Sequence, residues 1–355
     1  MLAVSDIAAT DLRDDDLSPL VTLAAQLRAN DVTAALAAAR MLGDSVGPAT
    51  RHADRWSALA TLATCDVGLA RICEPHLDAL SILDESELPR AVTARASERT
   101  WGVFAAEGGD EPLEARRSPD GWILDGVKPW CSLAASLDAA LVTARVDGSD
   151  ERSLFAVELR QPGIETDESS WHARGLAEVA SGPVRFRHVT AELIAPDGWY
   201  LERAGFWWGA IGVAACWYGG AVGVARRVHQ GVAKRPDPHA QAHLGAIDTA
   251  LQSARRALAE AASQADGDAP AAESAAFTQD SAEPRLVAKR VRATVAAACD
   301  EVLTRAGRAL GPAPLALDEQ HAKRVSDLTL YIRQHHAERD LASLGSALAN
   351  GPAPW

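Results

Sequence analysis

Residues 120–146, DGWILDGVKPWCSLAASLDAALVTARV, determine the predicted fold more than any other stretch of this sequence. The runs GWILDGVK and AALVTARV are short, largely apolar and bounded by turn residues, which is typical of β-strands. The tetrapeptide SPDG before the first run and VDGSDER after the second predict turns. The stretch therefore predicts two strands of a sheet, joined by the loop PWCSLAASLD.

Similar strand signals continue outward from this stretch, from about residue 99 to about residue 197. The runs TWGVFAAE, SLFAVEL, GPVRFRHV and AELIAP are each followed by turn residues. We therefore expect a β domain over residues 99–200, built as an antiparallel sheet or barrel.

Both flanks of the β domain have the periodicity of helices, with apolar residues recurring every three or four positions. On the amino-terminal side this pattern begins at about residue 17 and predicts a helical domain over residues 1–98. On the carboxyl-terminal side it predicts four long helices over residues 201–355. The acidic, Ala- and Ser-rich segment 264–284 contains two prolines and is expected to be a loop between these helices.

Composition excludes several classes of partner. The formal net charge of -13, from 48 acidic and 35 basic residues, repels phosphate backbones, so nucleic acid is not an expected partner. The five cysteines have no C-x-x-C spacing, which argues against a zinc site or a disulfide framework. Reduced thiols and an amino terminus without a secretory pattern predict a cytoplasmic protein.

Residues 204–225, AGFWWGAIGVAACWYGGAVGVA, carry no charge and are long enough to span a bilayer. The segment is rich in Gly and Ala and is flanked by Arg203, Arg226 and Arg227. Small residues allow close helix packing in a protein core as well as in lipid. We favour a buried helix of the bundle and expect no membrane association.

The order of a helical section, a β section and a four-helix section resembles the acyl-CoA dehydrogenase superfamily. Residues 120–146 look like its middle-domain signature, a strand ending in (L/I)(N/D)G-x-K-x-W, then a small hydroxyl residue and A-x-x-A-D. The matching residues are Leu124, Asp125, Gly126, Lys128, Trp130, Ser132 and Asp138. Residues 173–194 resemble the run that closes the β domain, and residues 205–227 stand where the family opens its first bundle helix.

The resemblance implies an α+β fold with an N-terminal helical section, a middle antiparallel β-barrel and a C-terminal four-helix bundle. It also implies FAD as the cofactor and α,β-dehydrogenation of an acyl-CoA or related thioester, an activity of lipid metabolism. A homo- or hetero-oligomer is expected, because family members bury bundle faces between subunits.

The cofactor-binding residues implied by the resemblance lie first in the loop Trp130, Cys131 and Ser132. Trp130 would pack against the isoalloxazine ring, and the Ser132 hydroxyl would bond near N5 of the flavin. The plainer interpretation is that Trp130 is a core aromatic and Ser132 a turn residue at the end of a strand.

Two further cofactor contacts are implied. Phe104, Ala105 and Ala106 stand where the family has a strand followed by T-E-P-x-x-G-S-D; here AAEGGDE could preserve the backbone contacts but not the hydroxyl contacts. Arg235 is a candidate remnant of the arginine that contacts the FAD pyrophosphate across a subunit interface, although the Phe-Gly of that motif is absent.

The catalytic base departs most from the family pattern. The first bundle helix offers no carboxylate over residues 207–225, and near the C-terminus His335, with Glu338 close by, stands where the family has a Glu. An imidazole can serve as a base near neutral pH, which favours a flavin-dependent monooxygenase of the same fold as an alternative function. A second alternative is a non-catalytic subunit that pairs with a complete homologue. The plainest interpretation of the segment RQHHAERD is a solvated helix end without a catalytic role.

The sequence CEPHLDAL at residues 73–80 contains four groups that can bind a metal, but no other ligand cluster completes a site. We therefore predict no metal site and expect this segment to be a helix surface near the entrance of the active site.

Overall fold

The structure, a computed structural model, describes residues 31–86, 96, 98–109, 111–119, 121–146, 149, 151–267, 284–350 and 353. The helix expected to begin at residue 17 is described only from residue 31 onward. Most of the loop expected at 264–284 also lies outside the described residues.

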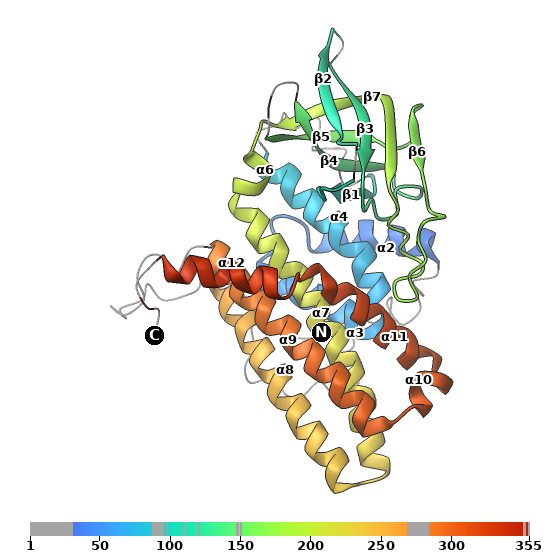
Figure 1. The fold of residues 1–355 in the computed structure, drawn as a ribbon, viewed down its shortest axis with the longest axis vertical. Helices are drawn as coiled ribbons and strands as arrows, with labels where there is room; N and C mark the ends of the chain where they lie inside the picture. The colour runs from blue at the N-terminus through green and yellow to red at the C-terminus, as the bar shows by residue number, and fades with distance from the viewer. Residues whose placement is uncertain are drawn as a thin grey trace.

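Three helices open the described chain: α2 (Val32–Ser45), α3 (His52–Cys65) and α4 (Val67–Glu85). The side chain of Asp66 caps α4 by accepting a hydrogen bond from the backbone N–H of Leu69 at 3.1 Å. Helix α4 packs against α2, α3, α7 and strand β1. It thereby connects the helical part of the molecule to the β domain (Figure 1).

The β domain contains seven strands: β1 (Trp101–Phe104), β2 (Glu114–Ser118), β3 (Gly121–Lys128), β4 (Ala139–Val146), β5 (Arg152–Glu158), β6 (Ile164–Thr166) and β7 (Val184–Ala195). Their order is β1-β4-β2-β3-β7-β5, with β6 paired to β7 and β4 also paired to β5. The stretch 120–146 therefore supplies β3 and β4, as its apolar runs predicted.

The sheet is not the wholly antiparallel barrel that was expected. Strand β4 pairs in parallel with both β1 and β2, so the sheet is mixed. The β2–β4 pairing covers two residue pairs, Glu114 with Arg145 and Ala115 with Val146. Strand β4 also pairs with β5 over seven residue pairs, from Ala139 with Glu158 to Arg145 with Arg152.

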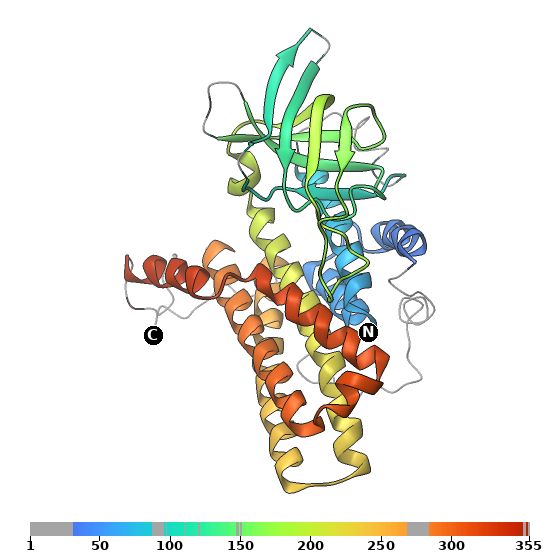
Figure 2. The same ribbon diagram turned by 45° about the vertical axis from the view of Figure 1, so that its right-hand side comes forward.

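The carboxyl-terminal part begins with the short helix α6 (Trp199–Glu202) and the long helix α7 (Ala204–Lys234). Helix α7 runs from the sheet to the far end of the molecule, where α8 (Pro238–Ala265) turns back, followed by α9 (Pro284–Leu310) (Figure 2). These three long helices pack against one another, and α7 also packs against α3.

The fourth expected helix is divided. The short α10 (Ala313–Leu317) precedes α11 (Glu319–Tyr331), a 3₁₀ turn η2 (Ile332–Gln334) and α12 (Glu338–Ala349). His335 is extended and Ala337 has a φ of 45°, so the chain changes direction between α11 and α12. Helix α12 has no buried residue and projects from the body of the molecule (Figures 1 and 2).

Helix α7 is the one described helix that is long and apolar enough to span a membrane, over Gly205–Lys234. In its most apolar 18-residue window, 67% of the residues are buried inside the protein. Its small residues allow α3 to approach closely, and the Thr64 hydroxyl donates a hydrogen bond to the carbonyl oxygen of Gly219 at 3.1 Å. This packing is that of a core helix, as the sequence favoured.

Candidate active site

The loop between β3 and β4 begins with a strained turn. Trp130 and Leu133 have φ values of 59° and 58°, a conformation that costs a non-glycine residue about 1–3 kcal/mol. Trp130 is 62% exposed, and its indole meets the edge of Trp171 with the ring centroids 6.4 Å apart. An exposed aromatic side chain on a strained backbone offers a flat face on which a planar ligand can stack.

Segment 175–182, which precedes β7, holds this turn in place. The backbone N–H of Cys131 donates to the carbonyl of Gly182 at 3.1 Å, and that of Leu133 donates to Ala180 at 2.7 Å. The hydroxyl groups of Ser132 and Ser181 lie 2.8 Å apart. The Cys131 thiol is buried and donates to the carbonyl oxygen of Lys128, so it is not available to a ligand.

Helix α4 brings a cation and a carboxylate to the same loop. The Nη2 of Arg71 donates to the Ser132 hydroxyl at 2.9 Å, and its Nη1 lies 3.6 Å from Oε2 of Glu74. Arg71 Nη1 is buried and makes no hydrogen bond among the described residues. The spacing of one helical turn places Arg71 and Glu74 on one face of α4. Ser132, Arg71 and Glu74 therefore form a connected row of polar groups.

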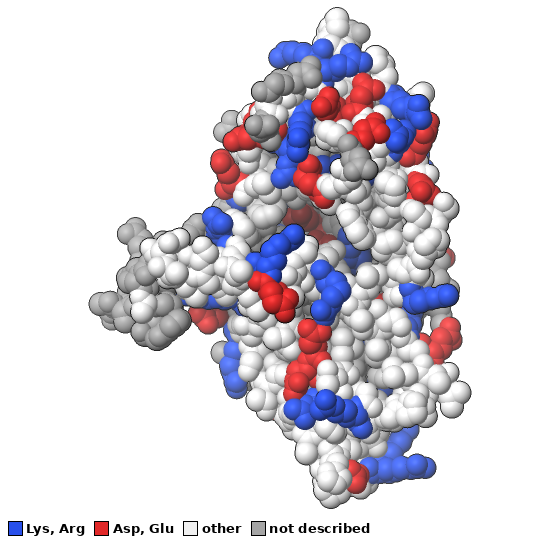
Figure 3. Space-filling view, in the orientation of Figure 1, with Lys and Arg blue, Asp and Glu red and all other residues white. Residues whose placement is uncertain are grey.

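This row leads to a cavity of about 430 Å³, here called the His335 cavity. Helices α4, α7 and α9 and the segment from η2 into α12 form its walls, and Figure 3 shows the surface hollowed between the β domain and α12, with acidic atoms at depth. Its lining includes Glu74, Asp78, Tyr200, Phe206, Trp207, Arg292 and His335. Aromatic walls with a few polar groups at depth are typical of a small-molecule site.

Burial controls the ionisation of the groups around this cavity. It raises the pKa of Glu74 to about 7, despite the opposing effect of Arg71. Burial also raises the pKa of Asp78, although Arg203 lies 3.6 Å away. The pKa of His335 is lowered by burial, which favours a neutral imidazole. Glu74 can thus exchange a proton near neutral pH.

Helix α9 fixes the backbone beside His335. The guanidinium of Arg292 stacks over the Trp217 ring, 4.6 Å from its centroid, and donates to the carbonyl oxygens of Ala210 at 2.8 Å and Gln334 at 3.1 Å. The two hydrogen bonds join α7 to the end of η2. They position His335 at the cavity wall although no helix contains it.

Of the two catalytic residues predicted from the sequence, only one lies at the cavity. His335 lines the cavity, but Glu338 is exposed in the first turn of α12 and does not line it. The structure therefore does not bring Glu338 into the site. Glu74 and Asp78, which the sequence analysis placed on a helix surface, supply the carboxylates instead.

The predicted cofactor contacts near β1 lie beside the Ser132 loop. Phe104 is buried and, with Arg71 and Ser132, lines a narrow cleft of about 10 Å³ between α4 and β1. Ala105 and Ala106 are half-buried, and the carbonyl oxygen of Ala105 accepts from Arg152 at 3.2 Å.

Arg235 ends α7 at the far end of the molecule, where α8 begins, whereas Trp130 lies in the β domain. Within one chain the structure does not bring Arg235 to the Trp130 loop. A role for Arg235 at the cofactor would therefore require a second subunit, as the resemblance implied.

The residues around the Ser132 loop fit a flavin. The exposed Trp130 indole offers a face to the isoalloxazine, and the Ser132 hydroxyl can hydrogen-bond to a ring nitrogen. The Nη1 of Arg71, which makes no hydrogen bond among the described residues, is a donor with positive charge beside that hydroxyl. A cation there suits a reduced flavin, which carries more negative charge than the oxidised form.

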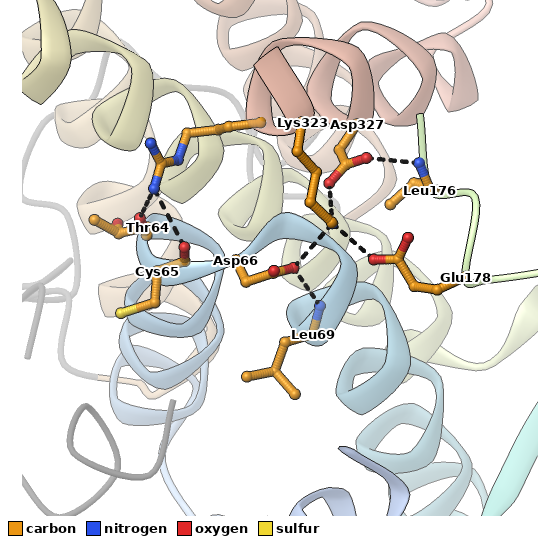
Figure 4. A network of polar contacts seen from close by, with 9 residues as sticks. Thr64, Cys65, Asp66, Leu69, Leu176, Glu178, Lys323 and Asp327 are labelled. Carbon is orange, nitrogen blue, oxygen red and sulfur yellow. Dashed lines mark hydrogen bonds and ion pairs between the residues drawn. The ribbon is translucent and has the colours of Figure 1, made fainter. Parts of the chain in front are cut away.

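A lysine in α11 anchors segment 175–182 to the helical part of the molecule (Figure 4). Lys323 Nζ lies 2.7 Å from Glu178, 2.5 Å from Asp327 and 3.4 Å from Asp66. The other oxygen of Asp327 accepts the backbone N–H of Leu176 at 2.7 Å. The carboxylates lie close enough together to hold a metal ion, but the Lys323 ammonium already stands among them.

Burial shifts the pKa values of the charged groups in this network. Burial alone would lower the pKa of Lys323, yet the surrounding carboxylates raise it well above its ordinary value. Burial raises the pKa of Asp327, which is 1% exposed. The close approach of Gly175 to the carbonyl of Ser326, where a Cβ would lie 2.0 Å from the oxygen, docks the same segment on α11. The Trp130 loop is thus held, through segment 175–182, by α11.

We expect Asp327→Asn to lower the free energy of unfolding by about 1.5 kcal/mol. The amide oxygen can still accept the N–H of Leu176, but the charged contact to Lys323 is lost. The control is Asp300→Asn, which removes an exposed ion pair with Arg333 and should cost less than about 0.5 kcal/mol. Urea denaturation of both variants checks this, and equal losses would contradict a structural role for the network.

Part of the sequence matches the model of a known protein family. The family model described as acyl-CoA dehydrogenase, middle domain, matches residues 93–189, which is less than half of the chain. Among curated proteins, none matches the sequence.

Solved structures match over nearly the whole chain. KijD3 in complex with FMN and a dTDP-linked amino-keto sugar is 19% identical, with a TM-score of 0.79 over 95% of this chain and 92% of that chain. TdsC from Paenibacillus sp. A11-2, with FMN and indole, is 17% identical, with a TM-score of 0.80 over 95% and 98% of the two chains. A nitrososynthase from Micromonospora carbonacea var. africana is 19% identical, with a TM-score of 0.74 over 93% and 94%. At these identities the likeness shows the fold alone.

Proposed function

We propose a function from one premise: this chain carries the middle domain of the acyl-CoA dehydrogenase superfamily within an acyl-CoA dehydrogenase-like fold. Its proposed activity is that of a flavin-dependent monooxygenase, which transfers one atom of dioxygen to a small, ring-containing substrate in the His335 cavity. When bound, reduced flavin would supply the two electrons that this reaction requires.

The proposal rests mainly on which residues line the His335 cavity. A histidine, His335, stands at the wall of the cavity in the segment where the resemblance led us to look for a glutamate, and Glu338 is turned to solvent. A neutral imidazole can accept a hydrogen bond or a proton from a substrate hydroxyl, amine or ring N–H. Tyr200, Phe206 and Trp207 offer apolar faces that exclude water and orient a ring.

The solved structures support this choice over the FAD-dependent reaction expected at first. KijD3 and TdsC are described with FMN, and TdsC is described as a dibenzothiophene monooxygenase. We propose that a flavin binds through its isoalloxazine ring at Trp130 and Ser132, so that FMN and FAD are both candidates. The adenosine end of FAD would require contacts beyond this loop.

Dehydrogenation of an acyl thioester is the second candidate, and Glu74 favours it. That reaction needs a base to take the α-proton of the thioester, and a buried carboxylate with a pKa of about 7 can serve. Glu74 lines the same cavity as His335. The two functions differ in the flavin form they consume and in their need for dioxygen.

The test supplies FMN and FAD, each kept reduced by a flavin reductase and NADH, with indole as the probe substrate and ¹⁸O-labelled dioxygen. The proposal predicts an indole product that carries one ¹⁸O atom and forms only when the protein is present. Reduction of bound oxidised flavin by butyryl-CoA without dioxygen, with no labelled product from indole, would overturn it in favour of dehydrogenation.

We expect His335→Gln to lower the turnover of the probe by about tenfold while flavin affinity stays unchanged. Glutamine is polar and similar in reach, but it cannot accept a proton at neutral pH. The matched control is His239→Gln on the exposed start of α8, which should retain wild-type turnover. Equal turnover in all three proteins would remove His335 from the mechanism.

A further inference from the structure

Glu74 lies where the loop of Ser132 meets the His335 cavity, and no motif in the sequence assigned it a role. It is 8% exposed and lines two cavities, the His335 cavity and a smaller one of about 120 Å³ between α3, α4 and α7. Arg71 connects it to the Ser132 hydroxyl by contacts of 3.6 Å and 2.9 Å. The carboxylate therefore lines the proposed substrate space and reaches the proposed flavin loop through Arg71.

We propose that Glu74 is a catalytic residue of this site, the acid that donates a proton during oxygen transfer and later regains it. The inference rests on the proposed function. In that reaction one oxygen atom is transferred to the substrate and the other leaves as water. Reduced flavin supplies two electrons and two protons, and dioxygen is the oxidant.

The proton balance gives Glu74 a defined part. Its carboxylic acid donates one proton to the departing oxygen atom, and the resulting carboxylate recovers a proton released as the flavin is oxidised. Arg71 holds the carboxylate toward Ser132 and limits the charge that develops when the acid is ionised. The acid is regenerated in each turnover, so no further reactant is needed.

The surroundings of Glu74 allow such exchange near neutral pH. Charged or titratable groups face it from each helix packed around it: Arg55 on α3, Arg71 and Asp78 on α4, Tyr200 on α6, Cys216 on α7, Arg292 on α9 and Tyr331 on α11. His335 lies across the cavity. Burial outweighs the opposing charges of Arg71 and Arg292 and raises the pKa of Glu74 to about 7.

The sign of the pH dependence follows from this shift. Glu74 is a proton donor only below its folded pKa, so its contribution to turnover falls as the pH rises through about 7. The pKa of Glu74 is higher in the folded protein than in the unfolded chain. As the pH rises from about 4.5 to 7, the free energy of unfolding of the wild type therefore falls relative to that of a variant without the carboxyl group. Turnover and stability therefore change over neighbouring ranges of pH.

The experiment compares wild type, Glu74→Gln and Glu74→Asp between pH 5 and 9. It measures turnover of indole with reduced FMN, the dissociation constant of FMN and the infrared band of a buried protonated carboxyl group. Glu74→Gln should turn over at least tenfold more slowly at pH 6, lose the decline in turnover through pH 7 and lose the infrared band, with FMN affinity within twofold of wild type. Glu74→Asp should keep the decline at a lower rate.

Glu85→Gln is the matched control, because Glu85 lies on the same helix and pairs with Arg203 at 2.9 Å, outside the His335 cavity. It should keep the wild-type profile and the infrared band. If wild type turns over and Glu74→Gln keeps the same rate and the same pH profile, the role of Glu74 is overturned. If wild type itself transfers no oxygen to indole, the proposed function fails, and the role of Glu74 in it fails as well.

Discussion

Replacing Gly219 with alanine is expected to lower the free energy of unfolding by about 3 kcal/mol. A Cβ at this position would lie 2.0 Å from the carbonyl oxygen of Ala60 and 2.8 Å from its Cα. These are backbone atoms of α3 and cannot turn aside as the end of a side chain can. The two helices must separate, which opens the core around α7 and breaks the hydrogen bond from Thr64 to Gly219.

Gly245→Ala in α8 is the matched control, because no atom lies within 4 Å of the Cβ that it would introduce. Alanine is the better helix former, so this variant should gain about 0.5–1 kcal/mol. Guanidinium denaturation of both variants measures the difference. A Gly219→Ala protein as stable as wild type would show that α3 and α7 do not pack at this distance.

The second large effect concerns the flavin. We expect Trp130→Ala to weaken flavin binding about 30- to 100-fold, since loss of an aromatic stacking face costs about 2–3 kcal/mol. The Trp130 backbone has a φ of 59° and its indole is 62% exposed, whereas alanine in the same place offers no aromatic face. Trp130→Phe should restore most of the affinity.

Flavin fluorescence quenching measures these affinities, with Leu317→Ala as the control. Leu317 is 85% exposed and lies in α10, in the helical part of the chain. That variant should bind flavin as wild type does. An unchanged affinity in Trp130→Ala would place the flavin elsewhere.

Much of the fold could be predicted from local signals. The apolar runs of residues 120–146 became β3 and β4, and the uncharged stretch 204–225 became the core of α7. The wholly antiparallel arrangement was wrong, because strand pairing depends on contacts between distant residues, and the parallel neighbours of β4 have no local signature. The break between α11 and α12 was also missed, since RQHHAERD contains neither Gly nor Pro to indicate it.

The candidate site could be predicted only in part. His335 was found because the resemblance directed attention to its segment, and the structure places it at a cavity. Arg71 was missed and Glu74 was considered only as a possible metal ligand, although the two form a charged pair one turn apart on α4. Their importance comes from burial and from the approach of Ser132, which lies 61 residues from Arg71 in the sequence. No periodicity reports such a contact.

A visible absorption titration of the purified protein with FMN and with FAD tests whether the loop of Trp130 and Ser132 binds a flavin. We expect a saturable shift of the flavin band with at least one of the two flavins, with tighter binding of the reduced form under anaerobic conditions because Arg71 stands beside Ser132. A spectrum that stays equal to that of free flavin, oxidised and reduced, would show that this loop does not bind flavin in the isolated chain and would indicate a subunit that needs a complete partner.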